Sequence, residues 1–140
     1  MAFSQYFGQK ILNWIKGNSF PTQLSNVYVS IHTGDPGTAG TSSDVTLTVT
    51  GSANRTAISS SAFTGVTGAS PSGFEIKNTN TVQITTNAQN NTQQTLTHFG
   101  LWDAQTSGNF IASGALTTSV DIQSGDTVQF NGNALGIKVV

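Results

Sequence analysis

Residues 27–37 read VYVSIHTGDPG, and this stretch decides the fold class of the chain. Val27, Val29 and Ile31 alternate with more polar residues, which is the period-two pattern of a strand with one buried face. A turn follows at once, because Pro36 has a fixed φ and Gly37 accepts values that other residues avoid. The stretch therefore predicts a β-strand that ends in a tight turn.

The same alternation recurs along the rest of the chain. It predicts strands at 45–49, 74–76, 82–84, 95–104, 110–116, 120–122, 128–130 and 135–139. Polar stretches predict surface loops at 38–44, where we expect mobility, and at 88–94. Gly114 suggests a bulge, and Asn131-Gly132 is a strong hairpin signal. Short strands separated by turns are typical of an all-β domain, a β-sandwich or jelly roll, which we place at residues 26–140.

Only the first segment predicts a helix, which we place at residues 1–17. The apolar residues that recur there at three- and four-residue steps are Phe3, Phe7, Ile11 and Trp14. Gly17 supplies a C-terminal stop, and Pro21 bars any continuation. This amphipathic helix has two interpretations. The simpler one is a helix packed on the protein's own sheet, and the alternative is an arm anchored on a neighbouring subunit.

The composition is rich in uncharged polar residues. Thr, Ser, Asn and Gln account for 59 of the 140 residues, whereas 8% are charged. Ordinary soluble domains carry roughly 25% charged residues. A surface of hydroxyls and amides suits a pleated β protein, and it can be buried between subunits without the large cost of desolvating ions.

Charge and cysteine content exclude several partner classes. The net charge is −1, and the five basic residues are scattered, so no cluster could neutralise nucleic-acid phosphates or bind a membrane surface. Cysteine is absent, which rules out disulfides and thiolate metal sites. The first residues lack a secretory signal, and no apolar run approaches the roughly 20 residues of a bilayer span. We expect that the protein is made and assembled in a cytoplasm.

Residues that could perform chemistry are few. The two histidines, His32 and His98, lack the spacing of a zinc motif, and no Gly-x-Ser-x-Gly elbow marks a nucleophile. Each histidine is expected to be a strand residue with a backbone or hydroxyl partner. Asp35 is expected to bond its own turn. We therefore predict no catalytic, cofactor-binding or metal-binding residues.

Two stretches carry a resemblance. They are residues 27–37, and residues 97–104 (THFGLWDA) followed by 107–109, 114–118, 124–128 and 133–135. With the amphipathic N-terminal segment, and in the same order along the chain, they resemble a family of small phage virion proteins often labelled tail fibre or decoration proteins. Residues 49–94 match that family poorly. The resemblance implies a non-enzymatic structural component of a bacteriophage virion.

The place in the virion is open at this stage. We favour a capsid decoration, or cement, protein on the outer shell, because the chain has neither a DNA-binding patch nor a shaft repeat. A tail or tail-fibre component is the alternative. A carbohydrate-binding β-sandwich is a third reading, since Trp14, Tyr28 and Trp102 could stack on sugar rings.

The expected partners are other copies of the chain, a homotrimer first, and the major capsid protein or other virion proteins. The residues predicted for a subunit interface are Phe3, Phe7, Ile11, Trp14 and Trp102.

Overall fold

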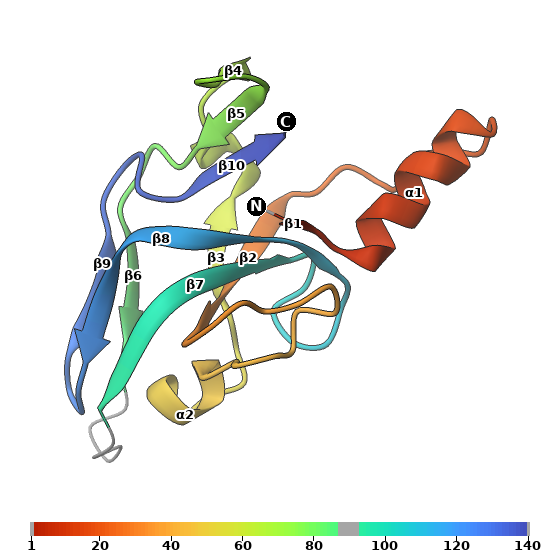
Figure 1. Cartoon of the computed structure of the whole chain (residues 1–140). Coiled ribbons are helices and arrows are strands. Elements are labelled where there is room, and N and C mark those ends of the chain that lie inside the picture. The colour runs from red at the N-terminus through yellow and green to blue at the C-terminus, as the bar shows by residue number, and fades with distance from the viewer. Residues whose placement is uncertain (1, 87–92, 140) are drawn as a thin grey trace.

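The computed structural model describes residues 2–86 and 93–139, and it has the predicted all-β architecture with one N-terminal helix (Figure 1). The strands are β1 (Ala2–Phe3), β2 (Asn26–His32), β3 (Thr56–Ser59), β4 (Thr67–Gly68), β5 (Phe74–Lys77), β6 (Val82–Thr85), β7 (Gln94–Trp102), β8 (Phe110–Ile122), β9 (Thr127–Phe130) and β10 (Gly136–Val139). The helices are α1 (Gln5–Ile15), α2 (Thr46–Thr50) and the 3₁₀ turn η1 (Ser60–Ala62). Most of the predicted loop 88–94 lies outside the described residues.

A five-stranded antiparallel sheet in the order β1–β8–β7–β2–β3 forms the first layer. Strand β2 pairs with β7 from Tyr28 opposite Trp102 to His32 opposite His98. Its apolar residues Val27, Val29 and Ile31 are buried on one face, as the alternation in the sequence predicts. The predicted strands at 110–116 and 120–122 form one long strand, β8, which pairs with β7.

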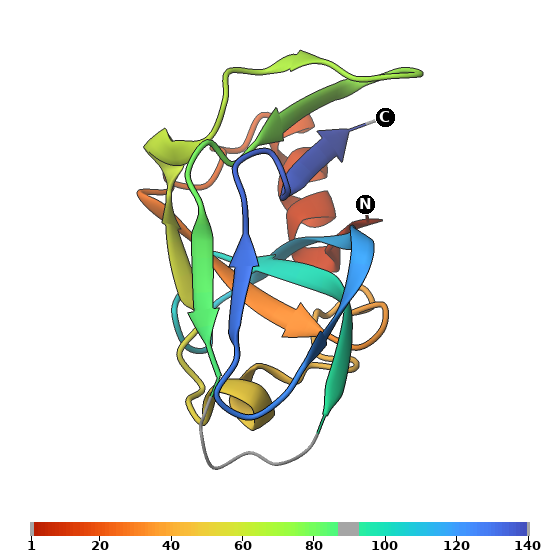
Figure 2. The same cartoon turned by 90° about the vertical axis from the view of Figure 1, so that its left-hand side faces the viewer.

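Strands β6 and β9 form the second layer. They pair antiparallel and lie in front of the central sheet in Figure 2. Alternate residues of both strands point inward and join the side chains of the sheet in one core. The buried core residues of these two strands are Val82, Ile84, Val128 and Phe130. A two-layer packing of this kind is sandwich-like, so the predicted fold class is confirmed.

The opposite face of the sheet is also covered, by the segment that follows β2. The sequence predicts a mobile loop at 38–44, but this segment is tied back onto the sheet. The Thr33 amide donates to the Ser43 carbonyl, and the Val45 amide donates to the Ile31 carbonyl. Gly40 has φ +75° and lies so close to the Phe110 ring that a Cβ there would overlap it. The segment therefore closes a second, smaller core.

Four polar groups inside this smaller core satisfy one another. The Trp102 Nε1–H donates to Ser30 Oγ at 2.9 Å, and the Ser30 hydroxyl lies 2.7 Å from His32 Nε2. His32 Nδ1 lies 2.9 Å from the Ser42 carbonyl, which can only accept. The Ser42 carbonyl therefore requires a proton on Nδ1, and in the neutral ring Nε2 accepts from the Ser30 hydroxyl. Burial of the ring lowers the pKa of His32, and the hydrogen bond to Ser42 opposes this shift.

The Asn78 side chain connects the segment between β5 and β6 to the segment between β9 and β10. It is fully buried between β5 and β6, where the pairing with β9 and β10 is interrupted. Its Nδ2 donates to the carbonyls of Asn80 and Asn131, and its Oδ1 accepts from the Leu135 amide at 2.8 Å. The hairpin prediction at Asn131-Gly132 is wrong, because β9 pairs with β6 and β10 pairs with β5. The segment between β9 and β10 wraps around the Asn78 amide instead.

The predicted strand at 45–49 is wrong as well, since residues 46–50 form the short helix α2. The Asp44 carboxylate accepts from the Thr46 amide at 2.8 Å at its start, and Gly51 ends it with φ +71°. Thr46 and Val49, three residues apart, are its buried residues. The bulge expected at Gly114 lies elsewhere, since the β7–β8 register shifts between Leu96 and His98 and between Leu101 and Trp102. Gly114 pairs with Phe99, and a Cβ there would lie 2.6 Å from the Phe99 ring.

The first prediction concerns pH. Because the pKa of His32 is lowered in the folded protein, the unfolded chain binds a proton first as the pH falls through about 6.5. Stability from this site is therefore complete above that pH and declines below it, by at most about 1.4 kcal/mol per pH unit. Urea denaturation between pH 7.5 and about 5 measures the decline.

The matched variants are His32→Gln, whose amide can replace both ring hydrogen bonds, and His98→Gln. The decline should persist in His98→Gln and flatten in His32→Gln. A wild-type stability that stays constant or rises as the pH falls contradicts the assignment of a neutral His32.

Candidate subunit interface

The N-terminal arm, residues 2–25, is fixed to the body at its base. Strand β1 pairs with the edge of β8, where Phe3 lies opposite Ala112. The Ser4 amide donates to the Ile111 carbonyl at 2.9 Å. The Ser4 hydroxyl accepts from the Phe7 amide at 3.0 Å and so caps helix α1, as N-cap serines do. The cap and the strand pairing together set the direction in which α1 leaves the sheet.

Helix α1 projects away from the body (Figure 1). None of its residues is buried. The interpretation of this helix as packed on its own sheet is therefore wrong. The alternative, an arm anchored on a neighbouring subunit, stays a prediction. Its observed limits, Gln5–Ile15, lie within the predicted 1–17, because residues 2–3 form a strand and Ser4 starts the helix.

A row of aromatic rings runs along one side of the arm. The centroid of Phe7 lies 5.0 Å from that of Phe3 and 6.0 Å from that of Phe20. The Phe20 ring also meets Trp14 edge-on, at 6.1 Å. Phe20 belongs to the segment that returns from α1 to β2, so this segment holds the helix in place. It leaves Phe20 46% exposed and Trp14 59% exposed.

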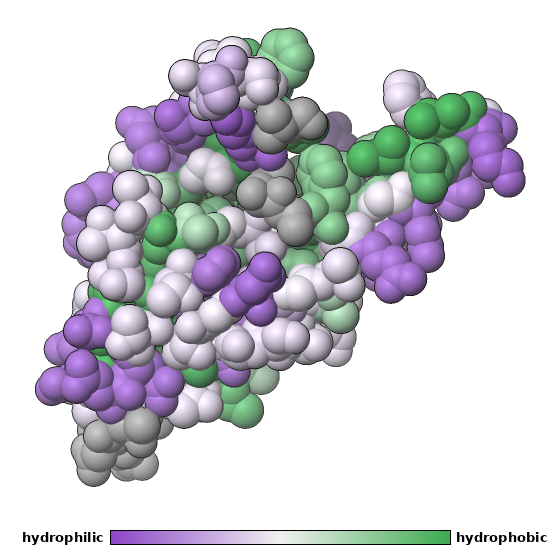
Figure 3. Space-filling model, in the orientation of Figure 1, coloured by the Kyte–Doolittle hydropathy of each residue, from purple (hydrophilic) through white to green (hydrophobic). Residues whose placement is uncertain are grey.

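The outer half of the arm keeps its apolar side chains in water. Leu12 and Ile15 are 64% and 69% exposed, beside the half-exposed Trp14. Figure 3 shows this hydrophobic surface along α1, next to hydrophilic residues on the other side of the helix. Burying such a side chain stabilises by about 1.5–3 kcal/mol relative to leaving it exposed. A partner that covers this end of α1 would gain that energy at several residues together.

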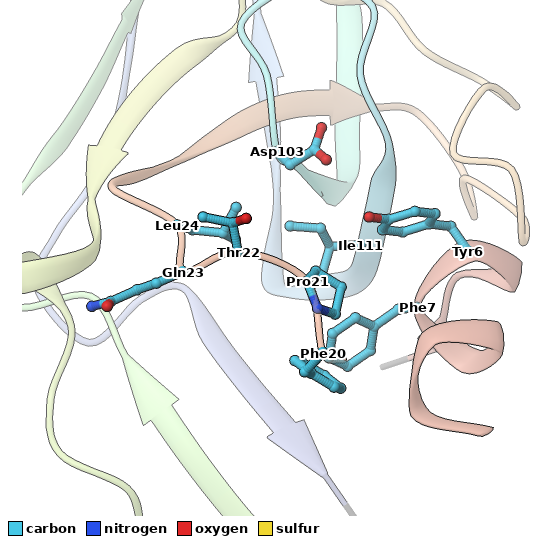
Figure 4. A pocket seen from close by; sticks show the side chains of 9 residues that line it. All are labelled: Tyr6, Phe7, Phe20, Pro21, Thr22, Gln23, Leu24, Asp103 and Ile111. Atoms are coloured by element: carbon cyan, nitrogen blue, oxygen red, sulfur yellow. The ribbon is translucent and has the colours of Figure 1, made fainter. Parts of the chain in front are cut away.

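A first cavity, of about 460 Å³, lies between α1 and the return segment (Figure 4). Tyr6 and Phe7 reach into it from α1, and Ile111 from β8. The Asp103 carboxylate at its edge is engaged by Asn109, whose backbone N–H and side-chain Nδ2–H donate to it at 2.6 and 2.8 Å. The cavity therefore offers apolar walls and a polar edge already satisfied by its own chain.

A second cavity, of about 340 Å³, lies on the other side of the arm's base, and we call it the apolar groove. The residues that line it are Phe3, Phe7, Leu24, Val27, Val66, Phe74, Glu75, Ile76, Leu101, Ile111, Ala112, Ile137 and Val139. All of them are apolar except Glu75, whose carboxylate lies 2.9 Å from the Lys77 ammonium. Val66, Phe74 and Val139 are 73%, 62% and 46% exposed at its rim.

Four of the five residues predicted for a subunit interface, Phe3, Phe7, Ile11 and Trp14, lie on the arm. The fifth, Trp102, is 6% exposed and contacts its own chain. The Arg55 guanidinium stacks on its ring at 3.7 Å. The groove itself was missed in the sequence. Of its rim residues, Phe74 lies on β5, Val139 on β10 and Val66 just before β4, and only their exposed apolar character could have indicated it.

The two histidines lie opposite each other on β2 and β7, and each is engaged by another group. His32 lies in the small core, and His98 Nδ1 meets the Thr97 hydroxyl at 2.8 Å, so both histidines have the hydroxyl or backbone partners that the sequence predicts. Asp35 accepts from the Gly37 amide at 2.8 Å, as predicted for a turn residue. Across residues 2–86 and 93–139, no three His, Cys, Asp or Glu side chains come together as a metal site would require.

Comparison with known families agrees with a structural role. Residues 2–138 match the family described as podophage GP4 fiber I protein gp80. The chain belongs to this family. It is therefore a phage virion structural protein, as the motifs at 27–37 and 97–104 indicate. The match to the gp80 family also runs through residues 49–94, where the sequence motifs resemble it least.

Two negative findings accompany this match. No curated protein matches the chain significantly. Within the described part of this gp80-family chain, no helix has the length and apolar composition needed to cross a membrane.

The two tryptophans test the conclusion that Trp102 belongs to the core and that Trp14 lies on an exposed arm. Trp102→Ala should destabilise the protein by about 3–5 kcal/mol, because it removes a buried ring that also donates a hydrogen bond. Trp14→Ala should cost less than about 1 kcal/mol in the isolated chain, because its ring is mostly in water. Urea denaturation of both variants at low protein concentration measures the difference. Similar losses for the two substitutions would show that the arm is packed as tightly as the core.

Proposed function

We propose that this chain is a non-enzymatic structural component of a phage tail fibre that works as a homo-oligomer. The match of residues 2–138 to a fibre protein family is the observation that carries the proposal. That family description favours the tail over the capsid surface. Capsid decoration, preferred from composition alone, becomes the second candidate, and its support is a compact domain without a shaft repeat.

The surface chemistry supports a role in an assembly. With 8% charged residues and abundant hydroxyls and amides, contact with neighbouring subunits desolvates few ions. Among the described residues, the exposed large apolar side chains other than Leu47 lie on the arm and around the apolar groove, and patches of this kind mark interaction sites.

The domain's form suggests where in a fibre it belongs. A shaft needs a repeat that extends along an axis, and this chain has one sandwich with one projecting arm. It therefore suits a compact segment of a fibre, such as its attachment point or its tip. The arm connects copies there, and we expect a trimer first. Other virion proteins are the expected further partners.

Copy number and location in purified particles test the proposal. Quantitative mass spectrometry, with the major capsid protein as internal standard, should find a few dozen copies of the chain at most. After mild disruption, these copies should follow the tail fraction and stay absent from the emptied shells. Hundreds of copies on the shells, comparable with the major capsid protein, would overturn the tail placement and establish decoration.

A further inference from the structure

We propose that the outer half of helix α1 docks in the apolar groove of a second copy of this chain. The inference rests on the proposed function, since it names the contact by which copies of a fibre component assemble. Amphipathic helices commonly bind proteins by laying an apolar face in a hydrophobic groove. Here the chain presents both halves of such a contact, a helix without cover and a groove without an occupant among the described residues.

The helix cannot reach the groove of its own chain. Its base forms one wall of that groove through Phe3 and Phe7. Pairing of β1 with β8 and packing of Phe20 against Phe7 and Trp14 hold the helix pointing outward. Leu12 and Ile15 therefore stay outside the groove while these contacts persist, and they are available to a neighbour.

Charge favours a second copy as the occupant. The first 25 residues carry Lys10 and Lys16 and no acidic residue, so the arm has a formal charge of +2. The net charge of the chain is −1, so the remaining residues sum to −3. An arm of one copy is thus opposite in sign to the body of another. Near the groove, Glu75 is paired with Lys77, and the Lys138 ammonium on β10 donates to the Ser70 carbonyl.

The exposed area also fits a contact between copies. A compact monomer of 14.6 kDa is expected to expose roughly 6,900 Å². This chain exposes 7731 Å². The excess of about 800 Å² is consistent with a helix that projects from the body and exposes apolar side chains. The contact joins different surfaces of two copies, helix to groove, so it can close into a ring of identical subunits.

Disulfide trapping tests the contact, because the chain contains no cysteine. One tagged version carries Ile15→Cys on the helix, and a differently tagged version carries Phe74→Cys on the groove rim. The two are co-expressed, purified together through both tags and oxidised. A disulfide between different tags can form only between two copies, and it requires Cα atoms within about 7 Å. Leu12→Cys and Val66→Cys provide a second pair if the first is misaligned.

The matched control is Leu47→Cys. Leu47 is 60% exposed on α2, at the opposite end of the molecule from the groove (Figure 1). The helix-to-rim pairs should cross-link at least tenfold more than any pair containing Leu47→Cys. Adding Leu12→Lys to the Ile15→Cys chain should reduce the cross-linking at least tenfold, because it brings a charge into an apolar site. Circular dichroism checks that each variant is folded.

Cross-linking of both helix-to-rim pairs at the level of the Leu47→Cys control would overturn the inference. So would cross-links that join helix to helix alone. Neither result bears on the tail location, which mass spectrometry of particles decides separately. Conversely, shell-bound copies that form the helix-to-rim cross-link would leave this contact standing and overturn the fibre proposal.

Discussion

Helix α1 has more apolar surface than its own chain covers, and this constraint determines which surfaces are open to a second copy. Leu12, Trp14 and Ile15 stay largely in water, although each would gain free energy from burial. The domain does not hide them by folding the helix back, because the pairing of β1 with β8 and the Ser4 cap direct the helix outward. Local interactions within one copy therefore leave apolar side chains of the helix exposed, as the proposed contact between copies requires.

The body of the protein provides a rigid base for this arm. Its central sheet is packed on both faces, by β6 and β9 on one side and by the segment after β2 on the other. The second face encloses the Ser30, His32 and Trp102 network, in which each buried polar atom has a partner. Gly100 permits this arrangement, since a Cβ there would lie 2.5 Å from Ser30 Oγ.

The strands could be predicted where one face of the sheet is buried, as at Val27, Val29 and Ile31, because alternation then survives in the sequence. Residues 45–49 alternate too, yet they form a helix. The Asp44 carboxylate at its start and Gly51 at its end outweigh the preference of Val and Thr for strands. Turn chemistry misled at Asn131-Gly132, since the deciding contact is the amide of Asn78, 53 residues away along the chain.

The proposed subunit interface was also partly predictable from the sequence. The helical stripe marks Phe3, Phe7, Ile11 and Trp14 as apolar, but periodicity does not say whether a helix packs on its own sheet or projects. Trp102 shows the limit of residue type as a guide, because a buried ring and an interface ring look alike in a sequence. The groove depends on tertiary packing of β5 and β10 against the base of the arm, which no local pattern records.

The proposal that copies of this protein cover each other's arms is tested most directly by sedimentation equilibrium. The chain is measured over a range of micromolar concentrations. We expect a closed oligomer whose mass is a whole-number multiple of 14.6 kDa, with three copies as the first expectation. The charge-bearing variant Ile15→Lys should shift that equilibrium toward the monomer, and Leu47→Lys, on the surface away from the groove, should not. A wild-type chain that sediments as a single 14.6 kDa species at every concentration would contradict the claim that copies of this protein cover each other's arms.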